Sequence, residues 1–94
     1  MKPGFFSPIH PGEVLKNEIK SAGATTQQAA DAIGIARKNL SLILNSHASI
    51  TSEMAIRVSK ALGHTPEFWL NMQMRWDLAQ VDIRRIKVTK LSKG

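Results

Sequence analysis

The sequence predicts an all-α protein made of five helices. Its 94 residues are 43% hydrophobic and 21% charged, a composition that suits one small folded domain and argues against disorder throughout. Apolar residues recur three and four positions apart, which is the period of a helix with one buried face. Capping residues and glycines separate these stretches, and five helices without a strand account for residues 10–80.

The first helix is marked at both of its ends. Pro11 suits the first helical position and Glu13 complements the positive end of a helix, so a helix is expected to begin near His10. It should continue to about Ala22. Gly23 is well placed to end it, because glycine readily adopts the left-handed conformation that terminates many helices.

Two short helices joined by a tight turn are expected over residues 25–45. Thr25 and Gln28 match a capping box, in which each side chain accepts a hydrogen bond from the other residue's backbone, and this predicts a helix over 26–33. Gly34 stops that helix, and helical periodicity returns over 37–45. The sequence therefore predicts a helix-turn-helix.

The fourth and fifth helices have equally clear starts. Thr51 caps the fourth helix, whose apolar residues repeat at helical spacing until Gly63 ends it. Thr65 and Pro66 then provide a cap and a first-turn proline, which predicts a fifth helix that runs to about Gln80.

The charge divides the chain unevenly. A net charge of +6 favours a polyanionic partner such as nucleic acid, yet residues 83–94 hold five basic residues and no acid, so they carry +5 of it. We expect an N-terminal arm over 1–9, a folded domain over 10–80 and a basic tail over 81–94. For the tail, a helical extension, an edge strand and a disordered arm are all open.

Catalysis, cofactors and membranes find little support in the sequence. The chain has no cysteine, no signal-like or membrane-spanning apolar run and no glycine-rich phosphate loop, so we expect a cytoplasmic protein without a bound cofactor. Its three histidines, His10, His47 and His64, fall at element ends without a second ligand at helical spacing. We therefore expect neither an enzyme nor a metal site.

The helix over 37–45 has the polarity of a DNA-reading helix. Its apolar stripe, Leu40, Ile43 and Leu44, should face the core and leave the basic residues outward. Arg37 and Lys38 suit guanine O6 and N7 in the major groove. The alternative is that both are simply a solvated face, since any five-helix domain contains such a helix pair.

Three neighbours extend this expected reading surface. Asn39 and Ser41 suit phosphate oxygens or base edges, and outward Leu42 can meet a thymine methyl group. A recognition helix of this kind sits in the major groove of double-stranded DNA, and its amino end also favours phosphate.

The fifth helix predicts a dimer. Its apolar residues surround it, whereas a helix on a small core needs one apolar stripe, so a second partner is expected. We expect the contact to be made by a second copy and to involve Phe68, Trp69, Leu70 and Met74 on the dimerisation helix 65–80. The alternative is that the tail folds back over this face.

Several motifs resemble a known family. Residues 28–45 look like the helix-turn-helix of lambda-repressor-like, xenobiotic-response-element proteins. The runs His10-Pro11-Gly12-Glu13, Ile50-Thr51, Ala61-Leu62-Gly63 and Thr65-Pro66-Glu67-Phe68-Trp69-Leu70-Asn71-Met72-Gln73 resemble HigA-type antitoxins of bacterial toxin–antitoxin modules. The resemblance covers residue 10 to about 78. Two departures are Ala36, where the family usually has a capping Ser or Thr, and Ser46, in place of a glycine.

The resemblance implies a homodimer that represses its own operon by binding a palindromic operator and that neutralises a HigB-type endoribonuclease toxin. It assigns Arg37, Lys38 and Leu42 to bases, and Thr26, Gln27, Asn39 and Ser41 to the backbone or flanking bases. Alternatives are a stand-alone regulator without a toxin, a module that mainly masks a toxin, and a basic-tailed binder of RNA or membrane surfaces.

Overall fold

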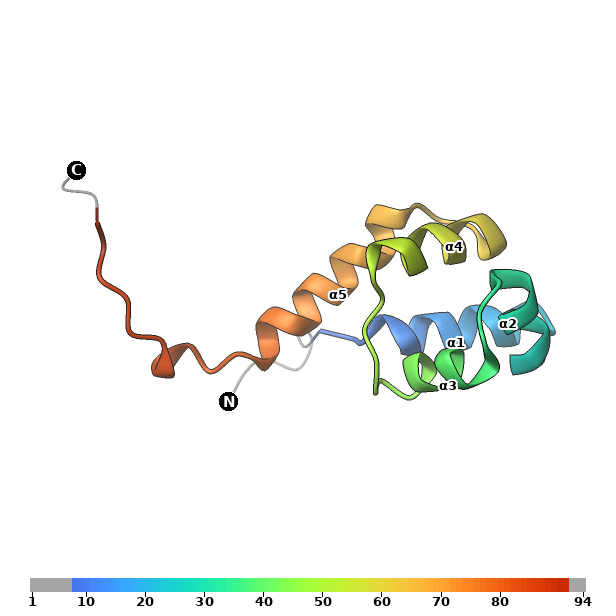
Figure 1. Ribbon diagram of the computed structural model, residues 1–94, viewed down its shortest axis with the longest axis horizontal. Helices are drawn as coiled ribbons and strands as arrows, with labels where there is room; N and C mark the ends of the chain where they lie inside the picture. The colour runs from blue at the N-terminus through green and yellow to red at the C-terminus, as the bar shows by residue number, and fades with distance from the viewer. Residues whose placement is uncertain (1–7, 92–94) are drawn as a thin grey trace.

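The computed structural model describes residues 8–91 and shows five α-helices, with no strand in that range (Figure 1). The helices are α1 (Pro11–Ser21), α2 (Thr26–Ile33), α3 (Arg37–Leu44), α4 (Ser52–Leu62) and α5 (Pro66–Gln80). The predicted all-α, five-helix class is confirmed. Most of the expected N-terminal arm, residues 1–7, lies outside the described residues, as do the last three residues of the tail.

The ends of α2 form as their sequence predicts. The Gln28 amide donates to the Thr25 hydroxyl oxygen at 3.0 Å, and the Thr25 amide donates to the Gln28 side-chain oxygen at 2.9 Å. At the other end, Gly34 takes a left-handed φ of 83°, which turns the chain toward α3. The two helices of the predicted helix-turn-helix are thus separated by residues 34–36.

All five helices contribute to one core. Leu15 of α1, Leu40 of α3, Val58 of α4 and Trp69 of α5 have no exposed surface, and α2 adds three small or branched side chains. The buried hydrophobic residues are Leu15, Ile19, Ala29, Ala30, Ile33, Leu40, Ile43, Leu44, Ile50, Ala55, Val58 and Trp69. The alanines let α2 lie close to its neighbours, because small side chains at a contact allow two helix axes to approach each other closely.

A glycine sets the distance between α1 and α3. Gly12 is buried in the first turn of α1, and a Cβ atom built there would collide with the carbonyl oxygen of Ile43 near the end of α3. No side chain fits between the two backbones at this point. The chain then leaves α3 through Ser46, whose φ of 62° is left-handed, the conformation that glycine adopts most easily.

His10 joins the start of α1 to α5. It is 2% exposed, and its Nδ1 atom accepts a hydrogen bond from the Gly12 amide at 2.9 Å. The edge of one ring meets the face of the other between His10 and Trp76, with centroids 5.2 Å apart. Burial lowers the pKa of His10 below its ordinary value, while the charges of Asp77 and Glu13 act in the opposite direction.

Gln73 joins α5 to the loop that follows α3. The Gln73 side chain is buried, and its oxygen accepts from the Ile50 amide at 2.8 Å while its nitrogen donates to Asp77 at 2.9 Å. A buried amide with both ends satisfied fixes local geometry, because breaking either bond would leave a polar group unpaired. The loop between α3 and α4 is therefore fastened to α5.

The tail points away from the helices. A single 3-10 turn, Ile83–Arg85, follows α5, and the chain then continues in extended form, away from the helical bundle (Figure 1). Every described residue of the tail is exposed, and Leu91 reaches 97%. The alternative that the tail folds back over α5 is wrong for residues 81–91. In the described part of the chain no helix is long and apolar enough to span a bilayer.

Acidification should destabilise the fold through His10. Burial lowers the pKa of His10 in the folded protein, so the unfolded chain takes up this proton first as the pH falls. The contribution of neutral His10 to the free energy of unfolding is therefore complete above the ordinary histidine pKa of about 6.5 and is lost as the pH falls below it. His10→Asn keeps a capping acceptor without this proton, so its free energy of unfolding should fall less between about pH 7 and pH 5. Urea denaturation across that range measures the effect.

The matched control for this change is His47→Asn, which alters an exposed histidine. It should retain the pH dependence of the unmodified protein. Equal pH dependence in His10→Asn and the unmodified protein would contradict the role given to the buried ring.

Candidate nucleic-acid interface

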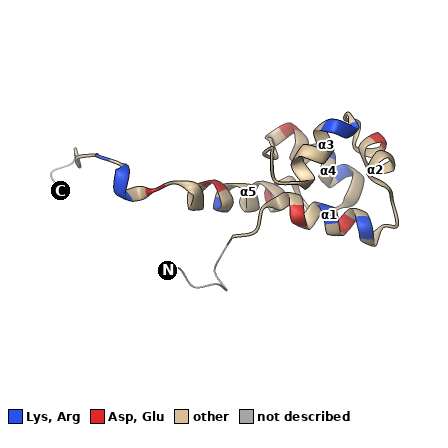
Figure 2. Cartoon of the chain, turned by 90° about the horizontal axis from the view of Figure 1, so that it is seen from below, with Lys and Arg blue, Asp and Glu red and all other residues tan. Residues whose placement is uncertain are grey.

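The helix α3 lies at the outside of the helical bundle with one face buried and one face free. Leu40, Ile43 and Leu44 are 0%, 3% and 7% exposed, as the sequence predicts. The first turn of α3, which carries Arg37 and Lys38, is basic and open to solvent (Figure 2). The predicted polarity of this helix is confirmed.

Arg37 and Lys38 are available for an external partner. Within residues 8–91 neither side chain takes part in an ion pair or a hydrogen bond, and the first turn of α3 holds no acidic residue. Two free cations therefore stand at the positive end of a helix, where the electrostatic field attracts anions. Ala36 offers no side-chain bond to this helix end, as its residue type predicts.

The other expected contact residues share the α2–α3 unit but differ in exposure. Asn39 is exposed, Leu42 is 40% exposed, and Ser41 is half-buried. Thr26, in the first turn of α2, is also half-buried. Gln27 is exposed, although its side-chain nitrogen donates to Asp31 at 2.9 Å, so binding through this nitrogen requires that bond to be exchanged.

A residue outside the helix-turn-helix holds its turn. Arg57 of α4 donates from Nη1 to the carbonyl oxygens of Ile33 and Gly34, both at 3.2 Å, and from Nε to Glu53 at 3.0 Å. The spacing of Glu53 and Arg57 on one helix face is readable from the sequence. The contact with the turn is tertiary, and sequence reasoning missed it.

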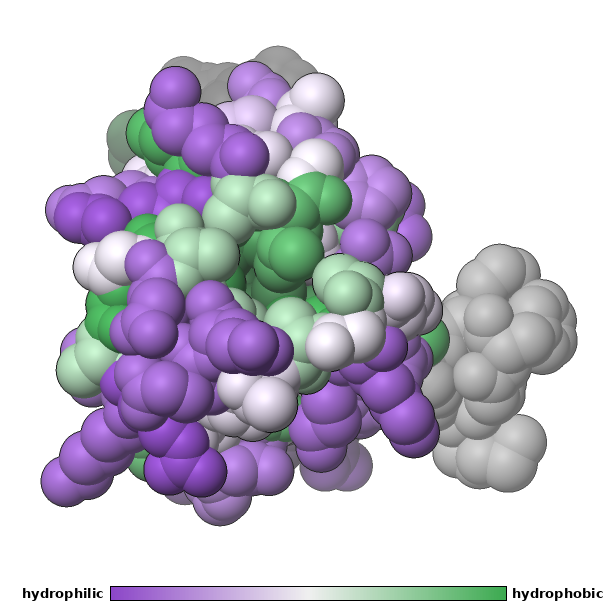
Figure 3. Space-filling model, turned by 90° about the vertical axis from the view of Figure 1, so that its right-hand side faces the viewer, coloured by the Kyte–Doolittle hydropathy of each residue, from purple (hydrophilic) through white to green (hydrophobic). Residues whose placement is uncertain are grey.

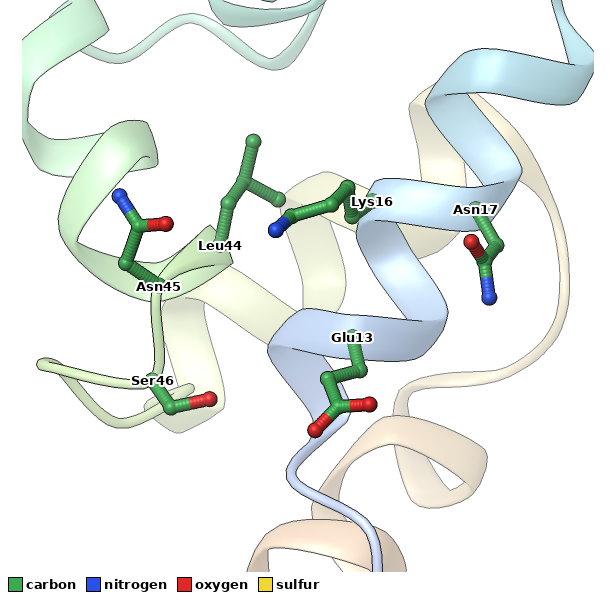
Figure 4. A pocket seen from close by; sticks show the side chains of 6 residues that line it. All are labelled: Glu13, Lys16, Asn17, Leu44, Asn45 and Ser46. Carbon is green, nitrogen blue, oxygen red and sulfur yellow. The ribbon is translucent and has the colours of Figure 1, made fainter.

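A polar cavity of about 310 Å³ lies beside the end of α3 that is farther from Arg37 (Figure 4). Lys16 reaches from α1 toward Leu44 and Asn45. The lining residues are Glu13, Lys16, Asn17, Leu44, Asn45 and Ser46. The cavity is lined by one cation, Lys16, and one carboxylate, Glu13, so it has no strong preference for an anion.

The residues expected at a dimer contact separate into buried and exposed ones. Trp69 is fully buried in the core of this chain, so its assignment to an intermolecular surface is wrong. Leu70 is half-buried against the core, whereas Phe68 and Met74 are 37% and 51% exposed. The apolar composition of the helix did not distinguish the face that Trp69 occupies from the face that stays open.

An apolar stripe remains on the outward side of α5. Leu70, Met74 and Leu78 lie four residues apart, and Val81 continues the same side of the helix. Leu78 is 65% exposed and Val81 is 48% exposed. Beside the stripe, Phe68, Asn71, Met72, Met74 and Arg75 line a shallow cavity of about 380 Å³.

The end of the molecule away from the tail is different. Its surface is hydrophilic around the edge, with an apolar band across its centre (Figure 3). The large exposed apolar side chains lie mainly on α5 and in the tail, and none belongs to α1 or α2. Among the described residues, no group of three His, Cys, Asp or Glu side chains is placed to hold a metal ion.

Comparisons with known proteins agree with this geometry. The family model described as Helix-turn-helix matches residues 15–70. The chain is 42% identical over 72 residues to Antitoxin HigA-1 of Vibrio cholerae, an alignment that covers 76% of this chain and 68% of that protein. It is 40% identical to Virulence-associated protein A' of Dichelobacter nodosus, covering 80% of this chain and 66% of that protein. The chain thus spans about two thirds of these curated relatives.

A solved structure extends the similarity. Antitoxin GraA in complex with its operator superposes with a TM-score of 0.74 at 33% identity, covering 96% of this chain and 98% of that one. The similarity therefore includes the helix-turn-helix, α5 and most of the tail.

Adding a cap to α3 should stabilise the protein. Ala36→Ser places a hydroxyl group where the helix has no side-chain cap, and such caps contribute about 0.5–2 kcal/mol. The free energy of unfolding should rise by that amount in urea denaturation. The control, Ala32→Ser, alters an exposed position within α2 and should be neutral or slightly destabilising. Equal effects at both positions would contradict the capping argument.

Proposed function

This chain belongs to the helix-turn-helix family, and on that basis we propose that it is a dimeric, sequence-specific DNA-binding repressor and the antitoxin of a HigBA-type module. The observation that carries the proposal is the free, outward pair Arg37 and Lys38 on the first turn of α3. The similarity to GraA, a protein solved with its operator, supports it. The proposed activity is binding, with no catalytic step, cofactor or membrane.

DNA reading follows from the placement of α3. With this helix in the major groove, Arg37 and Lys38 donate to guanine O6 and N7 and Leu42 contacts a thymine methyl group. Asn39 and Ser41 of α3, with Thr26 and Gln27 of α2, contact the phosphate backbone or flanking bases. The amide groups at the start of α3 add to phosphate attraction because no side chain caps them.

A second copy completes the site. The exposed residues Met74, Leu78 and Val81, with half-buried Leu70 at the start of the stripe and Phe68 at its border, give each chain a self-complementary apolar helix face. Two copies paired there present two recognition helices, which suits an operator with two half-sites about one helical turn, roughly 34 Å, apart.

The toxin-related part of the proposal rests on the similarity to Antitoxin HigA-1. We propose that the chain neutralises a HigB-type endoribonuclease in the cytoplasm and represses the operon that encodes both proteins. A short toxin gene beside its own would support this module. A solitary gene would instead favour a regulator that acts without a toxin.

Replacing Arg37 tests the reading surface. Arg37→Ala should weaken binding to the palindrome in its own promoter by about 1–3 kcal/mol per half-site and relax the preference at one base position. Thermal unfolding should hardly change, because the exposed side chain has little packing to lose. Competition binding with single-base variants of the palindrome measures both effects.

The control for this test is Lys60→Ala, which removes an exposed positive charge from α4. It should leave base preference unchanged. If Arg37→Ala lowers the affinity for every duplex equally, Arg37 contacts phosphate and not bases. Unchanged affinity would contradict the proposed reading surface.

Replacing Met74 tests the dimer. Met74→Glu places a charge in the middle of the exposed stripe, so sedimentation at tens of micromolar should show monomers while circular dichroism shows unchanged helix content. Gln80→Glu adds the same charge at an exposed position near the end of α5, outside the stripe, and should leave the dimer intact. A monomeric unmodified protein would contradict the proposed interface.

A further inference from the structure

The start of α3 lacks a local anchor. Its N-cap residue, Ala36, makes no side-chain hydrogen bond. The preceding turn is held to α2 by the amides of Gly34 and Ile35, which both donate to the carbonyl oxygen of Ala30 at 2.8 and 3.0 Å. The turn itself is thus bonded to α2 through a single carbonyl oxygen, while the buried Leu40 fixes the inner face of α3.

Arg57 supplies a restraint from outside the motif. Its Nη1 atom donates to the carbonyl oxygens of both Ile33 and Gly34 at 3.2 Å, the last residue of α2 and the first of the turn. A Cβ atom at Gly34 would lie 2.8 Å from this nitrogen, and the backbone there is left-handed. Glycine suits this position because of its left-handed backbone, and a side chain there would also displace the end of Arg57.

An exposed ion pair along α4 orients the guanidinium group. Glu53, one turn earlier on α4, accepts from the Nε atom of Arg57 at 3.0 Å. Ala55 and Val58 on the same helix are fully buried, so α4 is a fixed base for the arginine. The positive charge also lies at the carboxyl end of α2, where the helix dipole favours a cation.

We propose that Arg57 is a positioning residue that sets DNA sequence discrimination by holding the α2–α3 turn, and this proposal rests on the proposed DNA-reading function. Base contacts tolerate displacements of only about 0.5 Å, whereas the attraction of lysine and arginine to phosphates depends little on register. A looser turn should therefore impair base discrimination more than general DNA affinity. Arg57 acts through Arg37 and Lys38, without touching the bases itself.

The test compares Arg57→Gln and Arg57→Lys with the unmodified full chain on the promoter palindrome and on a random duplex. Arg57→Gln should weaken binding to the palindrome about tenfold, as expected for the loss of one good base contact. Its affinity for the random duplex and its salt dependence should stay nearly unchanged. Arg57→Lys should recover part of the loss, because an ammonium group can still donate to the turn carbonyls.

Lys60→Gln is the matched control, since it removes an exposed positive charge from α4, the helix that also carries Arg57. It should leave the ratio of palindrome to random binding unchanged. A ratio that Arg57→Gln leaves unchanged would overturn the proposal. Equal weakening on both duplexes would make Arg57 a phosphate contact, and unchanged binding on both would leave it no part in DNA recognition.

A second measurement needs no DNA. Amide hydrogen exchange in Arg57→Gln should speed up at Gly34 and Ile35 relative to Ala55, whose amide bonds to Thr51 within the start of α4. Unchanged exchange at these two amides would overturn the positioning role. If Arg57→Gln does not fold, Arg57→Lys carries both measurements. An unmodified protein that prefers no duplex would overturn the proposed function while leaving this exchange result intact.

Discussion

The close passage of α1 across α3 is the constraint on which the rest of the structure depends. It needs a residue without a side chain, because a Cβ atom at Gly12 would collide with the Ile43 carbonyl oxygen. The same short segment provides His10, which caps α1 through the Gly12 amide and meets Trp76 of α5. Residues 10–12 therefore contact both the helix proposed to read DNA and the helix proposed to pair with a second copy.

These two helices leave opposite kinds of surface open. The outward side of α3 starts with two cations that have no partner among the described residues, whereas the outward side of α5 is apolar around Met74 and Leu78. A charged surface suits a hydrated polyanion, and an apolar helix face suits a partner that excludes water. The fold thus separates the two proposed binding tasks onto different elements.

Local signals made most of the fold predictable. Caps such as Thr25 and terminating glycines such as Gly34 act through their own neighbours, so their helices could be placed from the sequence. The face of α5 that Trp69 occupies could not be placed, because apolar residues surround that helix and periodicity gives no preferred side. Arg57 and Gln73 were missed for a related reason, since each bonds a residue more than twenty positions away.

Those missed contacts add to the core packing of Leu40, Ile43 and Leu44 in fixing the orientation of an eight-residue helix. A helix this short is marginal by itself, and α3 has no side-chain cap. The turn before it is bonded by Arg57 of α4, and its end lies against Gly12 and precedes the loop that Gln73 fastens through Ile50. The segments that flank α3 on both sides are therefore bonded to other helices, the turn before it to α4 and the loop after it to α5. The helix proposed to read DNA and the helix proposed to pair with a second copy are thus joined by one hydrogen-bonded path, from Gln73 to Ile50 in the loop that follows α3.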